Sequence, residues 1–433
     1  MMKKRDKMIE EIYRTYLEHP MVQTDTRAIT PGCLFFCLKG ENFDGNDFAL
    51  QALTAGAAAV VTNRADLRGR DGFFVVDDTL ATLQALANHH RRQFRIPFIG
   101  ITGTNGKTTT KELITTVLRM KYRVACTQGN FNNHIGVPLT LLSIAPETEV
   151  AVVEMGANHP GEIAGLCEIS EPDYGVITNI GVAHIEGFGS RENIVNTKRA
   201  LYESVMKRGG TIFVNGDDAT LVECAGGYGK QVRYGAGEGS VCRGRIADMD
   251  PYLTVTVDNV TFRTHLAGAY NLANILSAIA VGRHFGIDLK QAAAAIEGYV
   301  PANHRSQIER VGDNTLIADY YNANPTSMAA AIDNLSRLSQ SRKCAVLGDM
   351  LELGEVSATE HRHIVELCSQ HDIEAYFVGS CFQQAVPSGS HAFANVAELN
   401  DFLEKHPIHN AIILIKGSRG MHLEKCALVP ANA

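Results

Sequence analysis

Short apolar runs alternate with helical patterns along most of this chain, and the alternation predicts its architecture. Between about residues 96 and 300, runs of four or five mainly apolar residues have the length of buried strands, and stretches with helical periodicity separate them. This order predicts a doubly wound parallel sheet with helices on both faces. The expected strands cover residues 98–101, 123–127, 150–154, 175–178 and 211–214.

The pattern changes in the second half of this region. Between about residues 231 and 266, apolar and polar residues alternate with period two, as in residues 253–257, which predicts an antiparallel edge added to the sheet. Helical periodicity returns over residues 271–284 and 289–297. Segment 298–303 contains glycine and proline and is typical of a linker.

Two further units flank the central one. Residues 1–95 have the pattern of a small α/β module, and from residue 304 onward strands and helices alternate again. In the first unit the expected strands are 33–38 and 72–76 and the expected helices 47–55 and 80–94. In the last unit the expected strands are 315–319, 344–347, 375–378 and 411–415, with helices after Pro325, Ser357 and Val396.

The chain is therefore predicted to be an α/β protein of three domains. At 433 residues it is longer than one ordinary domain. The predicted domains are a small N-terminal α/β domain over residues 1–95, a central doubly wound domain over 96–303 and a C-terminal domain over 304–433. The last resembles a Rossmann-like nucleotide-binding domain but has no Gly-x-Gly-x-x-Gly at its phosphate-loop position.

Composition and charge narrow the classes of function. A formal net charge of −7 argues against broad binding of nucleic acid or of anionic membranes. No apolar window approaches the length of a membrane span, and the basic first residues run into acidic ones, unlike a signal peptide. The ten cysteines are scattered without a Cys-x-x-Cys pair, as expected of reduced thiols. These features predict a cytoplasmic protein.

The strongest chemical signal is the glycine-rich loop around Gly103, Gly106 and Lys107. It follows an expected strand and precedes a helical pattern, the context in which backbone N–H groups and a helix N-terminus hold phosphate while the lysine neutralises charge. In the common Gly-x4-Gly-Lys-[Ser/Thr] pattern the first glycine would fall at position 101, which is Ile101 here. A Gly-Lys-Thr in a surface turn is the alternative, but the context favours nucleotide binding and hence a P-loop ATPase domain.

Polar residues also follow other strands of the central region. Glu154 ends an expected strand, where a carboxylate can hold Mg²⁺ or cap a helix. His184 follows the next strand in a glycine-rich loop and is a metal ligand, a general base or an ordinary loop histidine. Lys198 lies in an expected helix, and its sequence position alone indicates only a solvated charge.

The last unit repeats this arrangement. Asp319 ends a strand, where it can bind a ribose hydroxyl or form a capping turn. Residues 347–354 follow the next strand, and Lys416 and Arg419 follow the last one, where they can hold a carboxylate. His361 is expected on a surface helix without a chemical role. Polar clusters at strand ends in two domains predict one shared site.

Together these segments resemble the ATP-dependent Mur ligases of peptidoglycan synthesis, over nearly the whole chain. The motifs that carry the resemblance are residues 103–109, 129–138, 321–325, 347–354 and 416–419. The resemblance is strongest to the member that adds D-alanyl-D-alanine. It implies ATP-dependent amide bond formation between UDP-N-acetylmuramoyl-tripeptide and D-alanyl-D-alanine through an acyl phosphate, by a monomer that uses ATP and two Mg²⁺ ions.

The resemblance also implies the role of individual residues. The ATP site would comprise Gly103, Thr104, Asn105, Gly106, Lys107, Thr108, Thr109, Asn271, Asn274, Arg305 and Asp319. The metal ligands would be Thr108, Glu154, His184 and Lys198, and the catalytic set Lys107, His184, Lys198 and Arg305. The UDP-sugar would bind Thr24, Asp25, Thr26, Arg27, Lys39 and Gly40 in the first domain, and the dipeptide would bind Asn132, Asn133, Ser418 and Arg419.

Two positions depart from the family pattern. Relatives often carry a carbamate on the lysine that matches Lys198, with a glutamate two residues later, whereas this chain has Ala200 there and Glu203 further on. Tyr270 stands where a histidine is usual in the adenine-binding segment. The alternative functions are a sister ligase that adds the third residue, a folylpolyglutamate synthase-like ligase, and a nucleotide-dependent binding switch without ligation.

Overall fold

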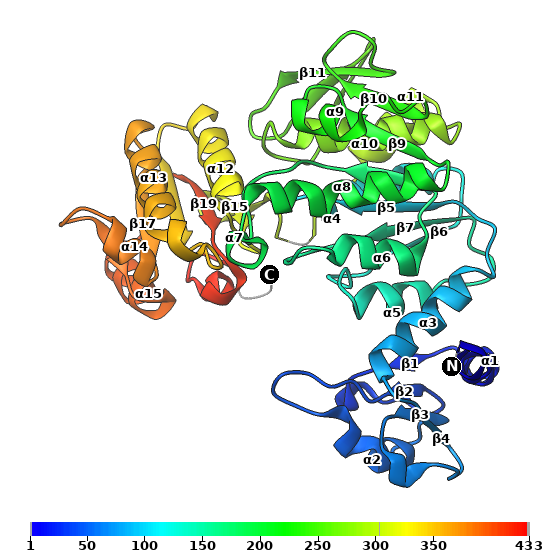
Figure 1. The fold of residues 1–433 in the computed structure, drawn as a ribbon. Coiled ribbons are helices and arrows are strands. Elements are labelled where there is room, and N and C mark those ends of the chain that lie inside the picture. The colour runs from blue at the N-terminus through cyan, green and yellow to red at the C-terminus, as the bar shows by residue number, and fades with distance from the viewer. Residues whose placement is uncertain (1, 303, 431–433) are drawn as a thin grey trace.

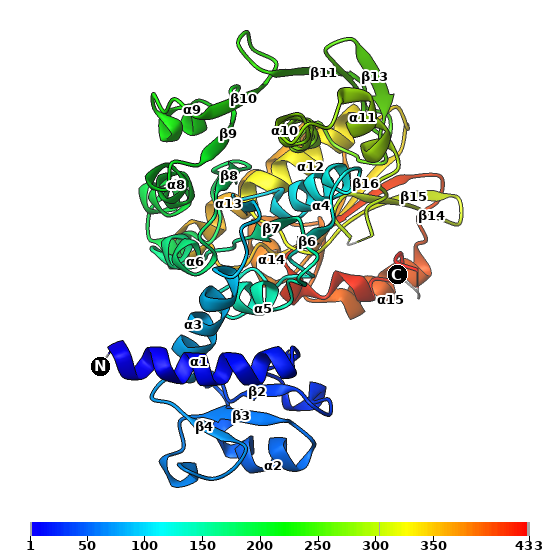
Figure 2. The ribbon, with the colours of Figure 1, turned by 90° about the vertical axis from the view of Figure 1, so that its right-hand side faces the viewer.

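The computed structural model describes residues 2–302 and 304–430 and contains three separate sheets (Figure 1). A four-stranded sheet lies at one end of the molecule, a nine-stranded sheet occupies the centre, and a six-stranded sheet lies beside the central one (Figures 1 and 2). The α/β fold class predicted from the sequence is confirmed. No described helix is both long enough and apolar enough to span a membrane.

The N-terminal sheet is parallel, in the order β1-β2-β3-β4. Its strands are β1 (Val22–Gln23), β2 (Leu34–Phe36), β3 (Ala59–Thr62) and β4 (Phe73–Val75), and its helices are α1 (Met2–Glu18), α2 (Ala49–Thr54) and α3 (Thr79–Arg91). The sequence pattern did not predict α1, whose few apolar residues, including Ile9, Ile12 and Tyr16, lie on one buried side of a mostly charged helix.

The central sheet has the order β13-β12-β11-β10-β9-β8-β5-β7-β6. Its strands are β5 (Phe98–Thr102), β6 (Val124–Cys126), β7 (Val150–Glu154), β8 (Tyr174–Ile177), β9 (Thr211–Asn215), β10 (Gln231–Gly235), β11 (Cys242–Asp248), β12 (Thr254–Val257) and β13 (Val260–Arg263). The expected antiparallel edge is only partly correct: β10 and β11 continue the parallel arrangement, and only β11–β12 and β12–β13 pair antiparallel. Period-two alternation indicates that one face of a strand is buried. Such burial does not determine whether the strand pairs parallel or antiparallel with its neighbour.

Helices cover both faces of the central sheet. The core on one face includes side chains of α4, α10 and α11, and the core on the other includes side chains of α5, α6, α8 and α9. The helices are α4 (Lys107–Leu118), α5 (Gly136–Leu142), α6 (Glu162–Ser170), α7 (Ile185–Phe188), α8 (Arg191–Lys207), α9 (Ala219–Ala225), α10 (Asn271–His284) and α11 (Leu289–Glu297). The bounds of α10 and α11 agree with the sequence prediction: α11 begins at a capping box formed by Asp288 and Gln291, and α10 contains a nearly continuous run of buried, mostly apolar residues.

The third sheet has the order β14-β15-β19-β16-β17-β18, with β14 antiparallel at its edge. Its strands are β14 (Gln307–Val311), β15 (Asn314–Asp319), β16 (Lys343–Gly348), β17 (Glu374–Val378), β18 (His391–Phe393) and β19 (Ile412–Lys416), and its helices are α12 (Pro325–Arg337), α13 (Ser357–Gln370), α14 (Ser380–Ala385) and α15 (Val396–Lys405). The sequence pattern did not predict β14, β18 or α14, which are edge or short elements.

The expectation that His361 lies on the surface is wrong. Its side chain is fully buried on α13, with its ring against Phe382. Its Nδ1 atom lies 2.8 Å from the Ser357 carbonyl oxygen, and its Nε2 atom accepts a hydrogen bond from the Met350 N–H at 3.0 Å. Both ring nitrogens are therefore satisfied by the backbone, which agrees with the structural role expected for this residue.

Helix α3 fixes the N-terminal unit to the central sheet. The Arg91 side chain at its end donates from Nε to the Ser170 carbonyl at 2.9 Å and from Nη2 to the Glu171 carbonyl at 2.8 Å, at the C-terminal end of α6. Its guanidinium also stacks 4.0 Å from the ring centroid of Phe98 on β5. A buried cation thus satisfies carbonyls that a helix end leaves without partners.

Replacing Arg91 with alanine should destabilise the junction between α3 and α6. We expect the free energy of unfolding to fall by about 2–4 kcal/mol, because the change leaves buried carbonyl groups unpaired. The matched control is Arg92→Ala, since Arg92 is exposed and pairs with the Glu171 carboxylate at the surface, which should cost less than about 1 kcal/mol. Urea denaturation of both variants measures the difference, and equal losses would contradict this role of Arg91.

Candidate active site

The phosphate loop connects β5 to α4, and its glycines are required by close packing. Gly103 has φ +149° and Gly106 has φ +78°. A Cβ atom on Gly103 would lie 1.9 Å from Thr178 Oγ1, and one on Gly106 would lie 2.7 Å from Asn274 Oδ1. Neither position therefore accepts a side chain without rearrangement, and the backbone N–H groups at the start of α4 stay open to the cleft.

Lys107 folds back onto its own loop. Its Nζ atom donates to the carbonyl oxygens of Gly103 at 2.9 Å and Thr104 at 3.0 Å. Burial lowers the pKa of Lys107 to about 8; Glu154 opposes this shift and Arg305 adds to it. The ammonium group is therefore poorly solvated, and an anion in the cleft would be a better partner than two neutral carbonyls.

Glu154 is a buried carboxylate with one free oxygen. Its side chain is 1% exposed at the end of β7. Oε1 accepts from the Asn132 amide at 2.8 Å, whereas Oε2 is buried without a hydrogen-bond partner among the described residues. A buried carboxylate oxygen left without a partner is unfavourable, and a hard cation such as Mg²⁺ prefers such a ligand. The residues present therefore fit this metal.

His184 and Lys198 flank the loop from the other side. His184 has φ +51° at the start of α7, and its Nδ1 pairs with the carboxylate of Glu352 from the third unit. Burial lowers the pKa of His184, and the Glu352 contact opposes this shift. With Nδ1 held in this way, Nε2 is the ring nitrogen left to face the cleft.

Lys198 is not the solvated charge that its position in a helix suggests. It is 3% exposed, because it lies on the buried side of α8, and its Nζ donates to the Gly103 carbonyl at 3.1 Å. Burial lowers its pKa to about 7, and the nearby Lys107 charge adds to the decrease. The amine is therefore substantially neutral near pH 7.

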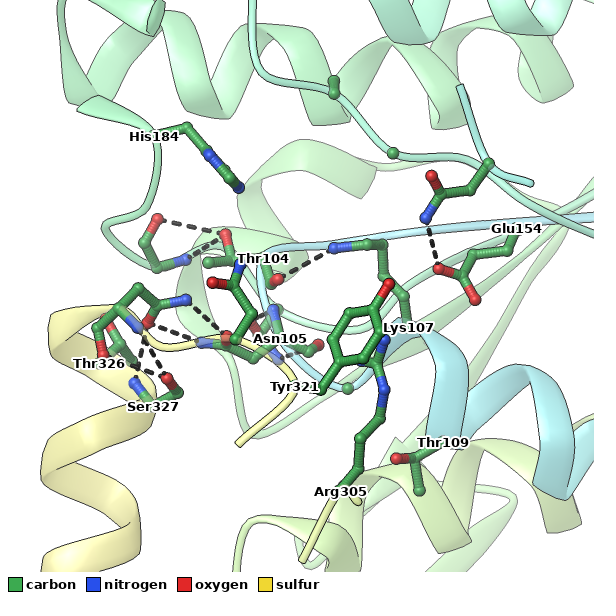
Figure 3. Close-up of a pocket in the computed structure, with 18 of the residues that line it drawn as sticks. Thr104, Asn105, Lys107, Thr109, Glu154, His184, Arg305, Tyr321, Thr326 and Ser327 are labelled. Carbon is green, nitrogen blue, oxygen red and sulfur yellow. Dashed lines mark hydrogen bonds between the residues drawn. The ribbon is translucent and has the colours of Figure 1, made fainter. Parts of the chain in front are cut away.

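The third sheet supplies the opposite wall. Asp319 ends β15, accepts from Lys416 Nζ at 2.7 Å and accepts from the Ser306 N–H at 3.2 Å. The guanidinium of Arg305 stacks 3.9 Å from the ring centroid of Tyr321, and its Nε is buried without a partner among the described residues. Figure 3 shows Arg305 and Tyr321 side by side and directed toward the phosphate loop.

These groups enclose a cleft of about 650 Å³ between the central and third sheets. Asn105 of the phosphate loop and Asn324 at the start of α12 bond across it, with Asn324 Nδ2 donating to Asn105 Oδ1 at 2.8 Å. The residues expected at the site that line the cleft are Thr104, Asn105, Gly106, Lys107, Thr109, Asn132, Asn133, Glu154, His184, Asn271, Asn274, Arg305 and Asp319.

Other expected residues lie outside this lining. Gly103, Thr108 and Lys198 are adjacent to it and buried, Ser418 is buried beneath it, and Arg419 is exposed near Tyr321. The first-domain residues Thr24, Asp25, Thr26, Arg27, Lys39 and Gly40 belong to the N-terminal unit and do not reach the cleft. There Asp25 and Arg27 form an ion pair with each other, and Lys39 pairs with Asp44.

Several lining residues were missed from the sequence. Asn179 holds the phosphate loop, accepting from the Asn105 N–H at 3.0 Å and donating to its carbonyl at 2.9 Å. Asn324 was singled out only within the motif 321–325, and Glu352, which pairs with His184 but lies outside the residues that line the cleft, only within the motif 347–354. A polar residue after a buried strand was the available signal for Asn179, whereas the partners of Asn324 and Glu352 are distant in the chain.

The fold and the cleft together define a nucleotide-dependent α/β enzyme. The chain belongs to the Mur ligase family. Three family models match it: the Mur ligase middle domain over residues 101–282, the Mur ligase glutamate ligase domain over 304–419, and the Mur ligase family catalytic domain over 19–91. It is accordingly an ATP-dependent ligase.

Similar proteins cover almost the whole chain. UDP-N-acetylmuramoyl-tripeptide–D-alanyl-D-alanine ligase of Bacillus subtilis is 36% identical over 98% of this chain and 98% of its own. A crystal structure of MurF from Acinetobacter baumannii matches with TM-score 0.84 and 31% identity over 93% of this chain and 91% of that one. MurF from Thermotoga maritima in complex with ADP matches with TM-score 0.84 and 28% identity over 93% and 95%.

Replacing Gly103 with alanine tests the packing of the phosphate loop. We expect affinity for ADP to fall at least about tenfold, because a Cβ at this position overlaps Thr178 and displaces the loop. The control is Gly209→Ala, which also has a positive φ of +71° but meets no atom closer than 3.9 Å. Calorimetric titration with ADP measures both variants, and unchanged affinity in Gly103→Ala would refute the steric argument.

Proposed function

We propose that this chain joins D-alanyl-D-alanine to UDP-N-acetylmuramoyl-tripeptide, with ATP converted to ADP and phosphate. The names of the relatives that match nearly the full chain support these substrates. The observation that carries the proposal is the convergence of Lys107, Glu154 and Arg305 on one cleft from two different sheets. Product analysis by mass spectrometry after incubation with ATP, Mg²⁺ and both substrates tests it directly.

In the first step the γ-phosphoryl group of ATP is transferred to the terminal carboxylate of the tripeptide. One carboxylate oxygen forms a bond to phosphorus, the bond to the β-phosphate oxygen breaks, and an acyl phosphate and ADP result. Both reactants are anions, so their approach requires positive charge. Lys107 and Arg305 supply it from opposite walls, and the unpartnered Arg305 Nε is a donor held ready for an oxygen of the transferred group.

A divalent cation completes the charge balance. Glu154 Oε2 and the Thr108 hydroxyl would provide oxygen ligands, His184 Nε2 would be a further ligand, and two Mg²⁺ ions are expected. When bound, Mg²⁺ neutralises phosphate charge and orients the phosphate oxygens. We assign His184 to this role and not to general base catalysis; the contact of Nδ1 with Glu352 leaves Nε2 toward the cleft, as in metal-ligating histidines whose other ring nitrogen bonds a carboxylate.

In the second step the neutral amine of D-alanyl-D-alanine attacks the acyl carbon. The C–N bond forms, the nitrogen loses a proton, and the C–O bond to phosphate breaks with release of phosphate. Of the residues proposed for the dipeptide, Asn133 lines the cleft and Arg419 is exposed beside Tyr321. Asn132 and Ser418 are proposed to act at the same subsite, although the Asn132 amide also holds Glu154.

We assign residues 1–95 to the UDP-sugar, 96–303 to ATP and 304–433 to completion of the ligase site. The uridine diphosphate end would be held by two exposed residues, Arg27 and Lys39, and by four partly buried ones, Thr24, Asp25, Thr26 and Gly40. In this arrangement Asn271 and Asn274 hold the adenine and Asp319 the ribose. The need for ATP supports action in the cytoplasm, and we propose that the enzyme acts there as a monomer.

Removing the Lys107 ammonium should abolish ligation with little effect on the sugar nucleotide. We expect Lys107→Ala to lower kcat at least about 100-fold, because the transferred phosphoryl group loses a preorganised positive charge. Affinity for UDP-N-acetylmuramoyl-tripeptide should stay nearly intact, since its uridine end binds elsewhere. The control is Lys207→Ala, an exposed lysine in the last turn of α8. Turnover retained by Lys107→Ala would exclude the assigned site.

The neutral Lys198 amine is suited to form a carbamate with CO₂. The amine nitrogen bonds to the carbon of CO₂ and loses one proton, which converts the buried amine to a carbamate anion whose oxygens can bind Mg²⁺. Only the neutral amine can attack CO₂, so carbamate formation should increase as the pH rises through about 7 and decrease below it.

Carbon-13 NMR under labelled CO₂ at constant partial pressure, with Mg²⁺ and ADP present, measures this carbamate. The expected signal grows between about pH 6 and pH 8 and is absent in Lys198→Arg, because a guanidinium stays protonated throughout this range. A signal of equal size in Lys198→Arg would assign the carbamate to another amine. No signal in the unaltered enzyme would exclude it.

A further inference from the structure

The chain segment that carries Arg305 has an unusual backbone. His304 and Ser306, its neighbours on both sides, adopt φ values of +53° and +56°. Residues other than glycine adopt this left-handed backbone region at a cost in conformational energy, so surrounding contacts must hold them there. The segment follows α11 of the central unit and precedes β14 of the third one, which makes it the junction between the two walls of the cleft.

The third unit holds this segment at both flanking residues. The His304 ring stacks on Tyr320 with a centroid distance of 4.9 Å, and its Nδ1 lies 3.0 Å from the Tyr320 hydroxyl. The Ser306 N–H donates to Asp319 Oδ1 at 3.2 Å. Asp319 is in turn fixed by the Lys416 ammonium at 2.7 Å, so this side is anchored to β15 and β19.

The central unit reaches the same segment through Tyr270. Its hydroxyl lies 2.6 Å from Ser306 Oγ, and Tyr270 immediately precedes α10, which presents Asn271 and Asn274 to the cleft. The ring packs over Gly268, where a Cβ atom would lie 2.4 Å from it. The Tyr270 hydroxyl therefore ties the wall that carries α10 to the residue next to Arg305.

We propose that the Tyr270–Ser306 hydrogen bond is a latch that positions Arg305 for phosphoryl transfer. With Ser306 held from both walls, the Arg305 guanidinium is fixed between the Tyr321 ring and the phosphate loop. Tyr270 and Ser306 are thus positioning residues that act through Arg305. The inference rests on the proposed function, because that proposal places Arg305 at the transferred phosphoryl group.

Tyr270→Phe and Ser306→Ala remove the latch while keeping the ring and the backbone. We expect each to lower kcat about three- to tenfold, the worth of one hydrogen bond, and the double variant to be no worse than either single one. The KM for ATP should change less than about twofold, because the latch acts through Arg305 on the transferred phosphoryl group and not on the rest of the nucleotide. In an Arg305→Ala background neither change should lower kcat further.

The controls separate this inference from the proposed function. Tyr228→Phe removes a tyrosine hydroxyl that donates to the Gly210 carbonyl at 2.7 Å, outside the residues that line the cleft, and should leave kcat unchanged. Thermal unfolding of each variant checks that the fold persists. Failure of the unaltered enzyme to form the ligated product would refute the proposed function itself.

Three results would overturn the latch with the proposed function intact. They are an unchanged kcat in both single variants, an effect confined to the KM for ATP, and further loss in the Arg305→Ala background. The second would make Tyr270 a nucleotide contact, and the third would show that it acts independently of Arg305.

Discussion

Two lysine side-chain nitrogens converge on one backbone oxygen at the centre of this site. The Nζ atoms of Lys107 and Lys198 lie 2.9 and 3.1 Å from the Gly103 carbonyl oxygen. Burial lowers the pKa of each, to about 8 and about 7, and repulsion by Lys107 contributes for Lys198. Such a cluster is stabilised when an anion enters or when one amine loses its proton. The loop therefore favours a polyphosphate by charge, before any base-specific contact forms.

The same charge argument explains why the site spans two sheets. One wall places lysines and a carboxylate around the phosphate loop, and the other wall contributes Arg305. At the edge of a single sheet, Arg305 would have to lie among the same lysines. Contacts across the cleft hold the walls in register: Asn105 with Asn324, His184 with Glu352, and Tyr270 with Ser306. Each joins a residue near the phosphate loop or α10 to the third unit, so the geometry of the nucleotide site depends on how the two walls meet.

The sequence allowed prediction of the parts that local physics determines. The strands at 98–102, 150–154 and 412–416 are fully buried, mainly apolar runs, and α10 is a longer, nearly continuous apolar run that stops before Gly286, so their positions followed from the sequence pattern. Glu154 and Asp319 could be singled out because polar residues at the ends of parallel strands meet at one edge. Lys198 and His361 show the limit: both lie on helices whose polar residues look solvated, and only packing reveals that these side chains are buried. The Tyr270–Ser306 and His184–Glu352 pairs depend on how two units dock, which no local pattern encodes.

The three units are joined asymmetrically, and the asymmetry suits a long substrate. On one side Arg91 satisfies buried carbonyls at the end of α6, and the Tyr16 hydroxyl donates to the Leu142 carbonyl at 2.6 Å, so the N-terminal unit is bound to the central one by buried polar contacts. A ligand that starts at the exposed groups near Arg27 must therefore cover the distance to the cleft by its own length. On the other side the walls meet through a few side-chain hydrogen bonds that border the cleft itself. Because those bonds lie beside the nucleotide and the reacting groups, ligand binding and the register of the walls are energetically linked. A substrate bound to the N-terminal unit would thus present its reactive carboxylate to a site that the third unit completes.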